Sequence, residues 1–271
     1  MTQTTQALQS APTGHYRFKH VARSEALKVL TLRSSAITLA VTVAAALLVT
    51  GLVANSNLHH GARYYFGFDP TQTSLIGLIP AALTGGVFGA LLITGEYASG
   101  TIRTTLGASP RRPMLLLTKI AVTATAMTVF CELLAFAAFF LGQAILSGGG
   151  APSAGLGSPG ALRAVLMTGL FIALLSLMSF GFGLVFRSTA GAIACFVGIV
   201  FVLPLVMHAI SEPDLRYVPT QILTNSVMST VRQGPGGIIH PLSPTVGLLL
   251  MVLYAAVSLV VGATLFVKRD A

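Results

Sequence analysis

Six long apolar stretches separated by short polar segments restrict the folds open to this chain. They cover residues 35–54, 74–94, 115–146, 161–186, 190–210 and 243–267. Each is long enough for a helix to cross a hydrocarbon layer about 30 Å thick. Only 8% of the residues are charged, against about 25% in soluble domains. Because the stretches lack polar–apolar alternation, we expect an all-α membrane protein with six transmembrane helices rather than a lipid-facing barrel.

The basic residues are distributed unequally between the two sides of such a bundle. With six spans both chain ends share one side, and that side carries twelve of the sixteen Lys and Arg residues. The twelve are Arg17, Lys19, Arg23, Lys28, Arg33, Arg103, Arg111, Arg112, Lys119, Arg187, Lys268 and Arg269. The other four are Arg63, Arg163, Arg216 and Arg232. Since basic residues concentrate on cytoplasmic faces, we expect both termini in the cytoplasm.

Two regions follow from this topology. We expect residues 1–34 to form a cytoplasmic tail in which apolar residues such as Phe18, Val21 and Leu27 are mixed with basic ones. This pattern indicates a helix lying in the membrane interface, with a frayed basic tail as the alternative. Residues 35–271 form a single six-span membrane domain, with a cytoplasmic loop at 95–113 and a long external loop at 211–241.

Motifs for chemistry are scarce. The chain has no GxxxxGK[ST] phosphate loop, and it lacks the Gly-x-Ser-x-Gly, HExxH and paired-carboxylate patterns of hydrolases. His59 and His60 are adjacent in the first external loop but have no third ligand at metal spacing. We therefore expect no catalytic residues, no metal site and no cofactor in this chain, and any work driven by ATP requires a separate protein.

Glu132 is the only acidic residue inside a predicted span. A charged carboxylate facing lipid costs a few kcal/mol or more, so Glu132 must face the bundle, another helix or a wet path. It is a candidate path residue or proton relay. The alternative is a neutral structural carboxyl hydrogen-bonded to a Ser, Thr or Gln of a neighbouring span.

Three weaker patterns concern shape. Gly85 and Gly89 form a GxxxG pattern that can bring two helices close together. Pro204 predicts a bend or a hinge in the fifth span. Residues 222–231 are moderately apolar and lie between proline-bearing flanks, so they indicate a short external or re-entrant helix, with a surface loop as the alternative.

Several segments resemble the membrane subunits of ATP-binding-cassette (ABC) transporters of the type-2 permease class, especially the actinobacterial type. They are RSEALKVLTLRSS at 23–35, TGEYASGTIRTTLGASPRR at 94–112, LLLTKIAV at 115–122, FRSTAGAIA at 186–194 and the terminal KRDA at 268–271. With the spacing of the six spans, the resemblance covers nearly the whole chain. The segment at 94–112 is its most specific part.

The resemblance implies a non-catalytic permease subunit in the plasma membrane. Two membrane subunits, a homodimer or a pair of related permeases, would form the path, and separate ATPase subunits would bind ATP and Mg²⁺. The transported substrate stays open between drugs, peptides, lipids and ions, with export as the expected direction. A proton-coupled carrier that uses Glu132 is the alternative function, and a membrane-embedded enzyme is a third. No nucleic-acid partner is expected, because the basic residues lie beside apolar spans.

The resemblance also makes the loop at 95–113 the main coupling element. Tyr97 and Ile102 are expected to supply apolar contacts to the ATPase, while Arg103, Arg111 and Arg112 supply charge-assisted contacts to acidic groups or lipid phosphates. Glu96 is expected to pair with a basic residue of the same loop or of the N-terminal helix. The alternative is that these charges only set the topology.

Overall fold

The computed structural model describes residues 33–59, 68–102, 112–210, 212–229 and 242–269. Six helical segments of that part are long and apolar enough to cross a membrane, and they confirm the all-helical, six-span prediction. The segments are Ser35–Leu58, Pro70–Ala98, Pro113–Gly148, Ala161–Phe186, Thr189–Ile210 and Pro244–Lys268. The expected interfacial helix lies outside the described residues.

Four of these spans contain a single main helix. They are α2 (Arg33–His59), α6 (Arg112–Gly148), α7 (Ala161–Phe186) and α11 (Pro244–Arg269). The second span joins α3 (Pro70–Leu75), the short 3-10 helix η1 (Ile76–Leu78) and α4 (Ile79–Ala98), so it begins four residues earlier than the sequence predicts. Asp69 accounts for the early start, because its carboxylate accepts the backbone N–H groups of Thr71 and Gln72 and caps the helix.

The fifth span is the irregular one. It joins α8 (Thr189–Val197), a π-helical turn η2 (Gly198–Val202) and α9 (Leu203–Ile210). After it come a 3-10 helix η3 (Glu212–Tyr217) and α10 (Pro219–Ser226). The short helix expected at 222–231 therefore exists as α10 but begins three residues earlier, because Pro219 fits the first turn of a helix.

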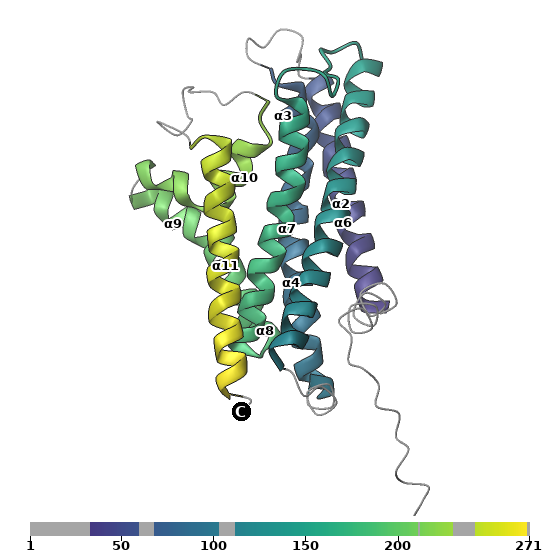
Figure 1. Ribbon diagram of the computed structural model, residues 1–271. Helices are drawn as coiled ribbons and strands as arrows, with labels where there is room; N and C mark the ends of the chain where they lie inside the picture. Colours follow the sequence, from purple (N-terminus) through teal and green to yellow (C-terminus); the bar gives the residue numbers. More distant parts are fainter. Residues whose placement is uncertain (1–32, 60–67, 103–111, 211, 230–241, 270–271) are drawn as a thin grey trace, which may run out of the picture.

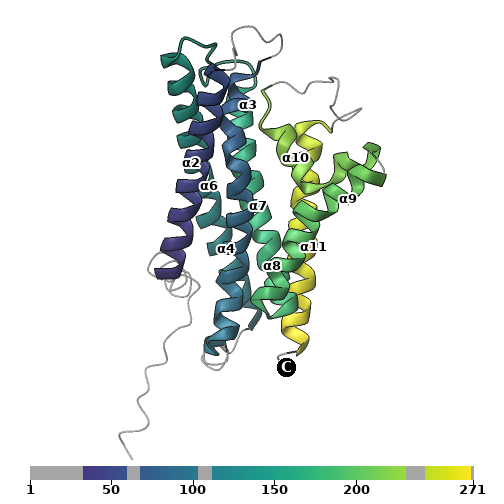
Figure 2. The ribbon, with the colours of Figure 1, turned by 180° about the vertical axis from the view of Figure 1, so that it is seen from behind.

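Helix α7 is the centre of the bundle. In its most apolar stretch, 78% of the residues are buried inside the protein. In the first and fifth spans the buried share of the corresponding stretch is 17%. Figure 1 shows α7 between α11 and α6, and Figure 2 shows α4 against it from behind. The first and fifth spans consequently lie at the periphery and turn most of their apolar side chains outward.

Small residues let the neighbouring helices approach α7. The Ser176 hydroxyl on α7 donates a 2.7 Å hydrogen bond to the Gly85 carbonyl on α4. One turn further, Gly89 lies so close that an added Cβ would overlap the Ser176 carbonyl oxygen. The GxxxG pattern thus brings α4 against α7. On the other side, an added Cβ at Gly181 would lie 2.6 Å from the Ser258 carbonyl carbon of α11.

The bundle has two ends with different contents, which we name by one acidic residue each (Figure 1). The Glu96 end contains the end of α4, the beginning of α6 and the end of α11. The Asp69 end contains α3, the end of α6 and α10. There the Gln143 amide donates to the Pro70 carbonyl and to the Ser74 hydroxyl, both at 2.9 Å, and so ties α6 to α3.

The close contact at Gly89 generates a stability prediction. Replacing Gly89 with Ala should force α4 and α7 apart and destabilise the folded chain by about 1–3 kcal/mol, the usual cost of overpacking. The measurement is the thermal unfolding midpoint of the purified chain in detergent. Gly95→Ala is the matched control in the same helix, because a Cβ there meets nothing within 4 Å. Equal midpoints for the two variants would contradict the packing described.

Candidate functional site: a coupling site at the Glu96 end

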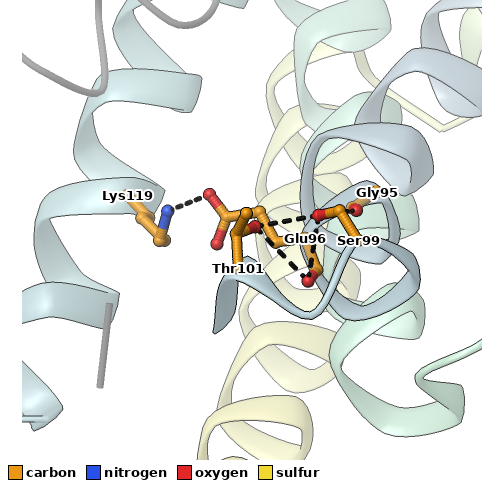
Figure 3. A network of polar contacts seen from close by, with 5 residues as sticks. All are labelled: Gly95, Glu96, Ser99, Thr101 and Lys119. Carbon is orange, nitrogen blue, oxygen red and sulfur yellow. Dashed lines mark hydrogen bonds and ion pairs between the residues drawn. The ribbon is translucent and has the colours of Figure 1, made fainter. Parts of the chain in front are cut away.

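Helix α4 ends in a tight turn made by its own polar residues. The Ser99 amide donates to the Gly95 carbonyl at 3.0 Å, and the Ser99 hydroxyl donates to the same carbonyl at 2.8 Å. The Thr101 and Ser99 hydroxyls lie 2.9 Å apart (Figure 3). Gly100 has φ = 70°, a left-handed conformation that glycine adopts without steric cost. These contacts satisfy carbonyls that a helix end leaves free, and they end α4 at a defined point.

A buried ion pair joins this turn to α6. The Lys119 ammonium and the Glu96 carboxylate lie 2.5 Å apart, with the two side chains only 5% and 13% exposed (Figure 3). A lysine is almost never this buried unless it is paired, because an uncompensated charge in an apolar environment is costly. The pair therefore holds the end of α4 against the second turn of α6.

Glu96 has a partner that the sequence did not indicate. The structure places it beside Lys119, inside the third span. The basic side chains expected as partners, in the loop and in the N-terminal helix, lie outside the described residues, so that pairing stays a prediction. The signal was present in LLLTKIAV, where a lysine flanked by apolar residues needs an anionic partner. Choosing that partner requires the helix packing, because the two residues are 23 positions apart.

The turn between α7 and α8 completes the site. The Arg187 guanidinium carbon lies 5.5 Å from the centre of the Tyr97 ring, within the range of a cation–π contact. Arg187 ends α7 with φ = 52°, and its amide donates to the Gly183 carbonyl at 3.0 Å. Two residues later the Thr189 hydroxyl donates a 2.9 Å hydrogen bond to the Thr94 hydroxyl. Both contacts tie the end of α4 to this turn.

An apolar layer lies beside the polar contacts. It consists of buried side chains from four helices and the residues just after α4. They are Ile93, Ile102, Leu116, Phe180, Leu184 and Phe266, and Tyr97 packs against them. Ile102 is only 6% exposed. Ile102 is thus buried in the bundle in this structure, whereas the sequence predicted a side chain on the surface.

The three arginines expected to dock a partner have a different status. Arg103 and Arg111 lie outside the described residues. Arg112 begins α6, and only its backbone is described. Their contacts to an ATPase or to lipid phosphates stay a prediction. The structure describes the two segments on either side of residues 103–111, the end of α4 and the beginning of α6, which we call the frame of the loop.

Glu132 is not part of this site. It lies 13 residues beyond Lys119, or about 20 Å along α6 at 1.5 Å per residue. Its carboxyl faces α7, where an added Cβ at Gly169 would come within 2.7 Å of the carboxyl carbon. Among the described residues, its buried Oε2 atom has no hydrogen-bond partner. Glu132 therefore faces another helix as expected, but without the Ser, Thr or Gln bond of the structural alternative.

The Glu96 end thus gathers three segments that are far apart in the chain: the end of α4, the beginning of α6 and the α7–α8 turn. A bundle of six helices that are each long and apolar enough to cross a membrane is a multi-pass membrane protein. The family model described as ABC-2 family transporter protein matches residues 21–271. The chain therefore belongs to the ABC-2 transporter family.

Membership identifies the chain as a membrane permease component of an ABC transporter. Such permeases are generally non-catalytic and work with ABC ATPase partners, and in bacteria they lie in the plasma membrane. A search of curated proteins found no match. Of the segments that carried the resemblance, residues 94–102, 115–122 and 186–194 meet at the Glu96 end.

The ion pair generates a second prediction, testable by a double-mutant cycle. Glu96→Gln or Lys119→Met should each destabilise the chain by about 3–5 kcal/mol, the cost of removing one member of a buried ion pair. The double variant should be more stable than the sum of the two losses predicts, because each single loss includes the same broken contact. The measurement is the unfolding midpoint in detergent.

Lys268→Met is the matched control, because Lys268 is an exposed lysine near the end of α11 at the same end of the bundle. It should leave the midpoint within about 0.5 kcal/mol of the wild-type value. Strict additivity of the Glu96 and Lys119 effects would show that the two side chains do not interact in the folded protein.

Proposed function

We propose that this permease component exports its substrate and that the Glu96 end faces the cytoplasm, where a separate ABC ATPase docks. The observation that carries the proposal is the joining of α4, α6 and the α7–α8 turn by one buried ion pair and its neighbouring contacts. Any force applied there reaches three spans together. The basic residues support the same orientation, because Lys119, Arg187 and Lys268 lie at this end and Arg163 lies at the other.

The ATPase contacts are assigned to the loop at 103–111. Arg103 and Arg111 follow and precede the described frame, so a partner that holds them pulls directly on the end of α4 and the beginning of α6. A bond to an acidic group of the ATPase is charge-assisted, which makes it stronger than a neutral hydrogen bond. Ile102 is buried in the apolar layer next to the loop. Because that layer is closely packed, a displacement of the loop would move the layer rather than only the loop.

The proposed assembly contains two permease copies, identical or related. The first and fifth spans expose large apolar side chains such as Leu48, Leu52 and Leu205. A peripheral helix of this kind contacts either lipid or a second helix bundle without an energetic penalty. Two copies with a path between them would use this surface, as the resemblance implies. The substrate class stays open between drugs, peptides, lipids and ions.

A proton-coupled carrier is the second candidate function, and one observation favours it. The buried Oε2 atom of Glu132 has no hydrogen-bond partner among the described residues, as expected for a carboxyl that exchanges a proton. In that case, Glu132→Gln should abolish transport driven by a pH gradient. In the ATP-driven mechanism, the same variant should retain transport that depends on ATP and ignores the gradient.

The coupling proposal is tested with the complete complex. The chain is co-expressed with a candidate ABC ATPase that carries a P-loop, purified, and reconstituted in vesicles. We expect the ATPase to co-purify, and Arg103→Glu or Arg111→Glu to reduce permease-stimulated ATP hydrolysis about tenfold, the effect of about 1.4 kcal/mol of lost contact energy. Membrane insertion of the variants should be normal, since loop charges add little to the stability of the bundle.

Arg232→Glu is the matched control for this experiment. It makes the same charge change in the loop between the fifth and sixth spans, on the side that the proposal places outside. Hydrolysis should be unaffected by it. A permease that is active without any bound ATPase would overturn the proposal, as would loop variants that hydrolyse ATP at the wild-type rate.

A further inference from the structure

The fifth span is broken by a combination of two features next to each other. The π-helical turn η2 makes hydrogen bonds over five residues, and the amide of Leu203 accordingly donates to the Gly198 carbonyl. Pro204 follows directly and has no amide hydrogen to donate. In a regular α-helix the Val200 carbonyl would accept from the amide of residue 204, and proline has no such donor. Such turns and prolines are the common causes of sharp helix bends.

A side chain from another element donates to this same carbonyl. The Thr220 hydroxyl on α10 donates a hydrogen bond to the Val200 carbonyl. The two residues are 20 positions apart, and the bond joins the fifth span to the helix that follows it across η3. A carbonyl that a proline leaves free in a membrane helix needs such a replacement, because lipid offers none.

Helix α10, which carries Thr220, is itself firmly placed. Its side chains Ile222 and Leu223 are 3% and 2% exposed, and the following Val227 is fully buried. The helix contacts α7 and α11. Just before it, the Tyr254 hydroxyl of α11 donates a 2.9 Å hydrogen bond to the Tyr217 carbonyl. Thr220 therefore acts from an element fixed to the core of the bundle.

Helix α9, beyond the break, has the opposite character. None of its described side chains is buried, and Leu205 and Ile210 are 79% and 76% exposed. Its main contacts are with η2 and η3, the two segments adjacent to it in the chain. Figures 1 and 2 both show α9 turned away from the direction of α8 and lying outside the bundle. Little besides the break itself holds it in this orientation.

We propose that Thr220 is a positioning residue that latches the fifth span in its bent form. When the hydroxyl leaves the Val200 carbonyl, α9 reorients towards the axis of α8 and changes the shape of the Asp69 end. This latch rests on the fold alone. Its use as the gate on the exit side, opposite the ATPase, rests on the proposed function.

The latch is tested first by a distance measurement that requires no substrate. Spin labels are attached to cysteines introduced at Leu205 on α9 and Leu249 on α11, both well exposed, in a chain whose native Cys131 and Cys195 are replaced by Ala. Pulsed electron–electron double resonance in lipid nanodiscs then reports the distribution of distances between the labels on α9 and α11. The variant Thr220→Val removes the hydroxyl and retains the shape, whereas Thr220→Ser retains the hydroxyl.

We expect Thr220→Val to increase the population with α9 reoriented towards the axis of α8, relative to the bent population, by about tenfold, the effect of losing one hydrogen bond. Thr220→Ser should retain the wild-type distribution. Thr224→Val is the matched control, because the Thr224 hydroxyl bonds the Thr220 carbonyl within the same helix. A wild-type distribution in Thr220→Val would overturn the latch, and so would an equal change in Thr224→Val.

A second variant keeps the proposal testable if Thr220→Val fails to fold. Pro204→Ala restores an amide donor for the Val200 carbonyl and makes the Thr220 hydroxyl redundant. It should shift the distances towards the straightened form by itself, and adding Thr220→Ser or Thr220→Val should then change nothing. Unchanged distances in Pro204→Ala would show that the break does not depend on this carbonyl.

The role in transport is tested separately, in the reconstituted complex with its ATPase. Thr220→Val should alter the amount of substrate moved per ATP hydrolysed while leaving ATPase binding intact. If Thr220→Val changes the distances but no ATPase binds the chain, the latch is supported and the proposed function is contradicted. If a variant with changed distances still moves the normal amount of substrate per ATP, the latch and the ATP-driven permease are both supported. The role of the latch as a gate is then contradicted.

Discussion

Close packing against α7 is the constraint on which the rest of the structure depends. Apolar surface alone does not hold helices together in lipid, since the lipid tails are equally apolar, so contact geometry and hydrogen bonds must do so. Small residues supply that geometry where Gly89 meets Ser176 and where Gly181 meets Ser258. The helices that approach α7 in this way form the rigid part of the bundle. The first and fifth spans, which lack comparable burial, remain at its edge.

The two ends of the bundle use polar groups differently. At the Glu96 end, the ion pair with Lys119 and the stacking of Arg187 on Tyr97 join three spans into one unit. At the Asp69 end, Gln143 ties α6 to α3 in a similar way. The last helix of the fifth span, α9, has no buried side chain among its described residues. A rigid end and an end with a loosely held segment are suited to receiving a force and to responding to it.

The sequence predicted most of the architecture because the signal is local. Apolar length alone identifies the spans, and all six are present with their ends shifted by a few residues. The first span continues to Leu58, and the second begins at Pro70, since a polar cap such as Asp69 is invisible to an apolar window. The short helix α10 was likewise predictable. The fifth span was expected to bend at Pro204, but the π-helical turn beside it was not foreseen, because it arises from backbone hydrogen bonding.

The candidate site was predictable only in part. Polar character and position in the chain pointed to the segment after the second span, and family resemblance gave it a role. The partner of Glu96, the burial of Ile102 and the involvement of Arg187 and Thr189 were out of reach, because each depends on which helix faces which. The chain by itself determined a six-span membrane bundle, its family and the residues at its turns. Only the tertiary structure decided which turns meet, since that choice comes from the packing of whole helices against α7 rather than from any local pattern.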